Sequence, residues 1–99
     1  MSKYVLIQKA DQDMDDIWEY IARDDIEAAT GWDTKLREAF DLLARNPKIG
    51  HRRKDLTLSP VLFWPVAEYL IIYRTHPDHI EILAVSQGSR DIPSYLRRR

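Results

Sequence analysis

Apolar side chains in the first half of the chain recur every three or four residues, which places them on one face of a helix. A first stripe consists of Met14, Ile17, Trp18, Ile21 and Ala22. A second consists of Ala29, Trp32, Leu36, Phe40 and Leu43, widened by Ala39 and Leu42. The first helix is expected to begin at residue 8, 9 or 11 and to fade near residues 23–25. The second should stop at Asn46-Pro47, because proline disfavours helix in the preceding residue.

Short apolar, β-branched and aromatic runs predict four strands. They cover residues 4–7, 61–64, 67–75 and 80–87. Pro65 is expected to close the second strand, and His76-Pro77-Asp78-His79 to form a tight turn before the last. Strand alternation separates the third run into two faces. One face holds Tyr69, Ile71 and Tyr73, and the other holds Leu70, Ile72 and Arg74.

The order of these elements predicts an α+β fold of the form β-α-α-β-β-β. The two helices form a hairpin, and the three later strands form an antiparallel meander. We expect a two-layer sandwich in which the helical hairpin packs on an antiparallel sheet, within one domain spanning residues 1–99. The strand near the N-terminus must join the same sheet to pair its backbone, but its neighbour in the sheet stays open.

The composition of the chain excludes several kinds of functional site. The chain has 99 residues, 44% of them hydrophobic and 31% charged, and it contains no cysteine. Cysteine-ligated metal sites, disulfides and thiol nucleophiles are therefore excluded. There is no apolar run of membrane-spanning length and no signal-peptide core, so a cytoplasmic location away from membranes is expected.

Charge is distributed unevenly along the chain. The net charge is only −1, yet acidic residues predominate before residue 45 and basic residues after it. A basic half suggests contact with an anionic or acidic partner. The candidate residues for contact with a target or anion are Arg52, Arg53, Lys54, Arg74 and Arg90. Because Arg74 follows an apolar strand, we expect it to have a carboxylate partner, either Glu81 or Asp91.

No catalytic, cofactor or metal fingerprint is present. The sequence has no GxGxxG, P-loop or HExxH pattern. His76 and His79 are read as solvated turn residues, and no histidine is placed to activate Ser86 or Ser89. We therefore assign no catalytic residue, no metal ligand and no cofactor.

Several segments resemble the ParE branch of the ParE/RelE superfamily of bacterial toxins. They are Ala10-x-x-Asp13-Met14-x-x-Ile17-Trp18-x-Tyr20-Ile21, Asn46-Pro47-x-Ile49-Gly50 with Arg52-Arg53, residues 69–74, Ile80-x-Ile82-x-x-Val85 and residues 88–93. The resemblance implies a toxin that is neutralised by a cognate antitoxin, ParD-like or similar, which itself carries the contact with DNA. It also implies DNA gyrase as the target, bound by protein–protein contact, with growth arrest as the outcome.

Two alternatives remain open. The first is a ribosome-dependent mRNA endonuclease of the RelE type, for which Tyr95 is the only late acid–base candidate. The second is a non-toxic member that binds an antitoxin. We expect the antitoxin to cover exposed aromatic side chains on the outside of this thin fold. It could bind either as a helix in a groove or as a strand added to the sheet. The candidates are Trp18, Trp32, Phe63 and Trp64.

Overall fold

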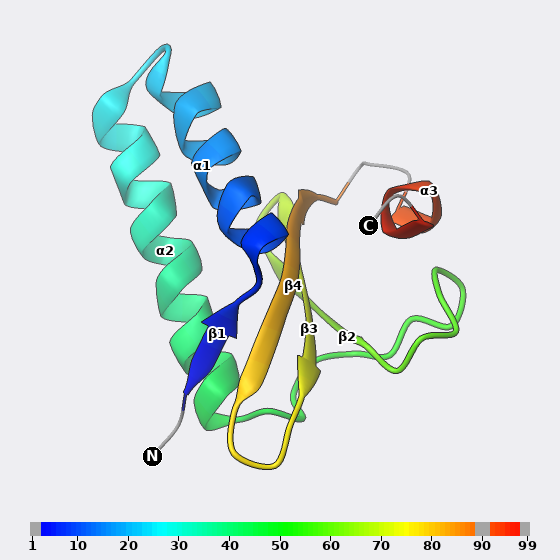
Figure 1. Ribbon diagram of the computed structural model, residues 1–99. Helices are drawn as coiled ribbons and strands as arrows, with labels where there is room; N and C mark the ends of the chain where they lie inside the picture. The colour runs from blue at the N-terminus through cyan, green and yellow to red at the C-terminus, as the bar shows by residue number, and fades with distance from the viewer. Residues whose placement is uncertain (1–2, 89–91, 98–99) are drawn as a thin grey trace.

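The computed structural model describes residues 3–88 and 92–97 and has two helices packed on a four-stranded sheet (Figure 1). Arg90 and Asp91 lie outside the described residues. The elements in chain order are β1 (Tyr4–Leu6), α1 (Gln8–Ala22), α2 (Ile26–Arg45), β2 (Leu62–Val66), β3 (Tyr69–Thr75), β4 (Ile80–Gln87) and α3 (Ile92–Arg97). The predicted order of two helices between one strand and three is confirmed.

The sheet is mixed, with strand order β1-β4-β3-β2. The predicted meander is confirmed, since β2–β3 and β3–β4 both pair antiparallel. β1 differs from the expected antiparallel sheet, because it pairs with β4 in parallel, Tyr4 opposite Ile80. The reason is topological. The chain reverses once between the two helices, once between α2 and β2, and twice within the meander, so β4 runs in the same direction as β1 (Figure 1).

Local chemistry marks both ends of α2, whereas the N-cap of α1, Ile7, makes no side-chain capping hydrogen bond. α1 starts directly after β1 at Gln8, the earliest of the expected positions. The Asp25 carboxylate caps α2 by accepting a hydrogen bond from the Ala28 N–H at 3.0 Å. α2 ends at Arg45, immediately before Asn46-Pro47, as predicted.

The main core lies between the hairpin and the sheet. The predicted stripe on α2 is largely confirmed, since Leu36, Phe40 and Leu43 are fully buried. Phe40 also packs against Tyr4, with ring centroids 5.3 Å apart. From the sheet, the face that carries Tyr69, Ile71 and Tyr73 completes this core.

The opposite face of the sheet is also covered, which the expected two-layer arrangement did not include. The loop after α2 and the short helix α3 lie over it (Figure 1). A second apolar cluster fills the space between them, formed by Val61, Phe63, Leu70, Ile72, Ala84 and Ile92, with Leu56 and Leu83 packed against it. Phe63 is only 1% exposed, so its prediction as an exposed groove aromatic is wrong.

One buried hydroxyl fixes the path of the chain from α2 to β2. Tyr73 is fully buried, and its hydroxyl donates to the Pro47 carbonyl at 2.8 Å and accepts from the Gly50 N–H at 2.9 Å. A Cβ on Gly50 would lie 2.4 Å from that hydroxyl oxygen, so this position accepts only glycine without a shift. The contact joins the loop after α2 to the centre of the sheet.

Candidate partner-binding groove

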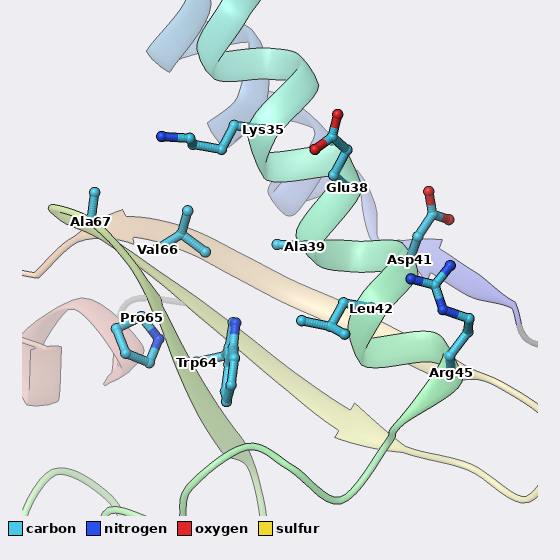
Figure 2. A pocket seen from close by; sticks show the side chains of 10 residues that line it. All are labelled: Lys35, Glu38, Ala39, Asp41, Leu42, Arg45, Trp64, Pro65, Val66 and Ala67. Atoms are coloured by element: carbon cyan, nitrogen blue, oxygen red, sulfur yellow. The ribbon is translucent and has the colours of Figure 1, made fainter.

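A groove of about 570 Å³ runs between α2 and the edge strand β2 (Figure 2). Its α2 wall carries charged side chains around two apolar ones, and its other wall is the end of β2 with the turn that follows. The lining residues are Lys35, Glu38, Ala39, Asp41, Leu42, Arg45, Trp64, Pro65, Val66 and Ala67. It is larger than the hollow of about 320 Å³ that lies beside Tyr20, Tyr69 and Val85.

The groove exists because the hairpin covers the sheet unevenly. α1 and α2 lie over the β1–β4 side, whereas β2 is at the far edge of the sheet (Figure 1). Trp64 and Val66 point to the helix-facing side by strand alternation, but they are only partly buried. In Figure 2, Leu42 and Trp64 face one another across the groove. Their apolar surface is thus available to a partner.

Four charged residues follow the α2 wall at helical spacing. They are Lys35, Glu38, Asp41 and Arg45, so the sign runs positive, negative, negative, positive. Within the described part of the chain, none of the four makes an ion pair, although Lys35 Nζ lies 4.9 Å from the centroid of the Trp32 ring. These charges are available to neutralise those of a partner.

The backbone edge of β2 offers few hydrogen-bonding groups. Phe63 already exchanges two hydrogen bonds of 2.8 Å with His51, on the side away from β3. By alternation, the next residue whose backbone points to that side is Pro65, which has no N–H. The prediction that Pro65 closes the strand is wrong, because β2 continues to Val66. An edge strand tolerates proline, since its N–H position faces away from the ladder.

The turn after β2 holds the one non-glycine residue with positive φ in the described chain. Ala67 has φ of 52° and lines one end of the groove. The turn is fixed by a hydrogen bond of 2.8 Å from the Gly88 N–H to the Glu68 carbonyl. A left-handed conformation costs an L-residue about 1–2 kcal/mol, so the end of the groove carries local strain.

The aromatic residues that were predicted to line an antitoxin groove lie in different parts of the structure. Trp64 lines the α2–β2 groove and stacks on His51, with ring centroids 6.1 Å apart. Trp32 lies beside Lys35 and packs edge-on against Tyr69. Trp18 is elsewhere, in a shallow hollow between α1 and α2. Sequence reasoning did not assign Leu42 or Ala67 to a site; for Leu42 the available signal was its place at the margin of the helical stripe.

The predicted basic residues do not form one cluster of unpaired cations. Arg74 pairs across the β3–β4 ladder with Glu81 at 2.6 Å, which confirms the expected carboxylate partner. The hydrogen bond from Arg74 is the main reason that the pKa of Glu81 is lowered, and His76 adds to it. Arg53 makes two hydrogen bonds to Asp55, at 2.9 and 2.8 Å, which lower the pKa of that carboxyl.

The remaining basic candidates are separate from these pairs. Arg52 and Lys54 are exposed in the loop that crosses the second sheet face. They make no ion pair with a described residue, while Arg90 lies outside the described chain. Leu58, 83% exposed, follows in the same loop. This loop therefore presents basic and apolar side chains together.

The β3–β4 turn brings its histidines together. The rings of His76 and His79 stack with centroids 4.5 Å apart. His76 Nε2 lies 3.4 Å from Glu81 Oε1, and His79 Nδ1 lies 2.7 Å from Asp78 Oδ1. The described residues contain no group of three or more ligands suited to a metal ion. No described helix is long and apolar enough to span a membrane.

Comparison with known proteins identifies the family. The sequence matches the family described as "ParE toxin of type II toxin-antitoxin system, parDE" over residues 4–92. The chain belongs to this ParE toxin family. The resemblance inferred from the sequence segments is thereby confirmed. No curated protein matches the chain.

A solved structure shows the same fold. The chain is similar to a structure described as the chromosomal ParDE TA system from P. aeruginosa, with a TM-score of 0.73 and 20% identity. That match covers 88% of this chain and 96% of the other. A conserved hypothetical protein from Helicobacter pylori matches with a TM-score of 0.49 and 14% identity, over 91% and 98% of the two chains.

Proposed function

We propose that this member of the ParE toxin family arrests bacterial growth in the cytoplasm by binding DNA gyrase, and that a ParD-like antitoxin neutralises it. The family match over residues 4–92 is the observation that carries the proposal. The similar P. aeruginosa structure is described as a ParDE system, which supports an antitoxin as the partner here. Contact with DNA then occurs only through the antitoxin.

The target-binding surface is assigned to the loop that follows α2. Arg52, Lys54 and Leu58 are exposed there, and a mixture of arginine and apolar side chains is common in protein interfaces. Arg53 and Arg74 are already paired with Asp55 and Glu81, so they contribute less unbalanced positive charge. The α2–β2 groove, on another part of the molecule, is left for the antitoxin.

A ribonuclease remains a second candidate because one cluster has suitable chemistry. Cleavage through a 2′-hydroxyl needs an acid, a base and a cation on the phosphate. His76 and Arg74 both contact the Glu81 carboxylate at the β3–β4 turn. Removing a proton-transfer group from such a site lowers activity by about 10²–10⁴-fold.

Controlled expression of the chain alone separates the candidates. Gyrase inhibition predicts growth arrest with a DNA-damage response, and loss of supercoiling by purified gyrase when the protein is added. Tyr95→Phe and His76→Ala should leave the arrest nearly intact. Arg90→Lys keeps the charge but loses the bidentate geometry, and should weaken the arrest in degree only.

The other outcomes are equally distinct. Ribosome-dependent transcript cuts that vanish in Tyr95→Phe or His76→Ala would replace gyrase with the ribonuclease function. Expression without any effect on growth would indicate a non-toxic, antitoxin-binding member of the family.

A further inference from the structure

We propose that a hollow between α1 and the sheet binds a small planar organic cation, namely a guanidinium group. Its walls include Asp13, Asp16 and Tyr20 from α1, and Tyr69, Val85 and Gln87 from the sheet. We call it the α1–β4 hollow. Its volume of about 320 Å³ is at the lower end of the range of about 300–1,000 Å³ for small-molecule sites. The inference goes beyond the proposed function and does not depend on the target or the antitoxin.

The α1 wall of the hollow is set by helical periodicity. Asp13, Asp16 and Tyr20 follow one another at spacings of three and four residues, so they lie on the same face of α1. The Asp13 carboxylate accepts a hydrogen bond of 3.0 Å from the Val85 N–H. This bond ties the helix to β4, over which α1 lies (Figure 1). The hollow therefore has one wall held in a fixed position against the sheet.

The buried hydroxyl of Tyr69 is the feature that points to a ligand. Tyr69 is only 5% exposed, and its hydroxyl makes no hydrogen bond to a described residue. Burial raises the pKa of Tyr69, and the nearby Glu68 and Tyr20 raise it further, so the hydroxyl stays neutral. The influence of Tyr20 places the hydroxyl near the α1 wall. Because buried hydroxyls normally have hydrogen-bond partners, a donor within the hollow is the missing partner.

The charge of the hollow selects a cation. Two of its residues are aspartates, and none of the described residues that line it is basic. Asp13 is already engaged by Val85, so Asp16 is the carboxylate assigned to the ligand. One Asp16 oxygen accepts from the Gln12 amide at 2.9 Å, a neutral donor that leaves the negative charge unbalanced. Asp16 makes no ion pair with a described residue.

The remaining groups favour guanidinium over ammonium. Tyr20 is 66% exposed, so its ring is available for a cation to stack on it. A guanidinium is flat and weakly hydrated, and it directs several N–H donors outward within one plane. It therefore suits the Asp16 carboxylate on one wall and the Tyr69 hydroxyl on the other while stacking on Tyr20. An ammonium is a compact, strongly hydrated charge that lacks the flat face.

The test titrates the ¹⁵N-labelled full chain with butylguanidinium, butylammonium and butylurea, which is planar but neutral. Butylguanidinium should bind with a Kd of about 1 mM, which is ordinary for a ligand of this size, and should shift the Val85 and Gln87 amide signals. Butylurea should bind at least about tenfold more weakly, because hydrogen bonds from a charged donor are stronger. Rising salt should reduce this difference. Butylammonium should bind with intermediate affinity.

Three variants locate the site. Asp16→Asn keeps the size of the side chain and removes its charge, and should weaken butylguanidinium binding about tenfold. Tyr69→Phe removes one hydrogen bond and should weaken it about fivefold. Asp15→Asn is the matched control, since it removes the same charge from the neighbouring exposed residue, which lines a different hollow, and should change affinity less than about twofold. Thermal melting confirms that each variant is folded.

A short blocked peptide with one central arginine distinguishes the two sources of the group. Binding of the peptide at least as tight as that of butylguanidinium assigns the site to an arginine side chain of a protein. Binding of butylguanidinium alone assigns it to a free guanidino compound, and both results uphold the site. No saturable shift with butylguanidinium at about 10 mM, or equal affinities for all three ligands, would overturn the proposal. Equal losses in Asp16→Asn and Asp15→Asn would also overturn it.

Discussion

The two sides of α2 have different roles, one in the core of the fold and one at the groove. On the side toward α1 and the centre of the sheet, Leu36 and Phe40 are fully buried, and Asp33 pairs with Arg37. On the side toward β2, Leu42 is half-buried and Asp41 makes no ion pair with any described residue. The difference separates residues that hold the fold from residues that remain available for a partner. Substitutions on the first side should change stability, and those on the second should change binding.

The largest expected effect is on the core side. Phe40→Ala should lower the free energy of unfolding by about 3–5 kcal/mol, because a large buried aromatic is lost and a cavity remains. Leu42→Ala is the matched change on the groove side and should cost far less. Chemical denaturation of the two variants measures the contrast. A Phe40→Ala protein within a few tenths of a kcal/mol of the parent would show that this stripe is not the core.

The next effect concerns the link between the sheet and the loop after α2. Tyr73→Phe removes only the hydroxyl, so the Gly50 N–H and the Pro47 carbonyl both lose this hydrogen-bond partner. Losing a partner for buried polar groups costs about 1–3 kcal/mol. Tyr69→Phe is the control, since the Tyr69 hydroxyl makes no hydrogen bond to a described residue. Equal unfolding free energies for the two variants would show that the Tyr73 hydrogen bonds contribute nothing.

A third effect should be stabilising and lies at the end of the groove. Ala67→Gly relieves the left-handed backbone and should raise the free energy of unfolding by about 1 kcal/mol, after the entropy lost to glycine is subtracted. The same exchange inside α2, Ala28→Gly, should lower stability by about 0.5–1 kcal/mol. Thermal melts of both variants provide the comparison. A destabilised Ala67→Gly protein would mean that the turn is unstrained.

The smallest effect depends on pH. The lowered pKa of Glu81 means that its ionised form is favoured in the folded protein, chiefly by Arg74. Its contribution is fully present above the unfolded-state pKa, about 4.3, and is lost as pH falls through the lower folded-state value. Glu81→Gln should therefore cost less than about 1 kcal/mol at pH 7 and nothing in strong acid. A parent–variant difference that is constant from pH 7 to pH 2 would rule out this linkage.

Much of the fold was predictable because it depends on local patterns. The stripe containing Leu36 and Phe40 and the Asn46-Pro47 stop placed α2 correctly, and strand alternation assigned the faces of β3. The parallel pairing of β1 follows from how the whole chain turns, which no local pattern contains. The cover over the second face was also missed, because Leu56 and Ile92 are distant in sequence and meet only in the folded protein.

The site was predictable only in part. Phe63 and Trp64 are adjacent in a strand, so their side chains point to opposite faces of the sheet, and only one of them can lie on the groove side. Strand alternation alone does not say which face has a second cover. The Arg74–Glu81 pair was anticipated as one of two options, and the register of β3 and β4 decides it. The groove itself depends on how far α2 extends over β2, which is a property of packing.

The three tryptophans allow the most direct test of the central claim, that the β2 side of α2 receives the antitoxin. Trp64 lies in the groove, Trp32 lies at its margin beside Lys35, and Trp18 lies in a different hollow. Their indole N–H signals in a ¹⁵N-labelled toxin should be followed as the unlabelled antitoxin is added. The account predicts that the Trp64 signal shifts strongly on binding while the Trp18 signal stays in place. A bound complex in which Trp18 shifts and Trp64 does not would contradict it.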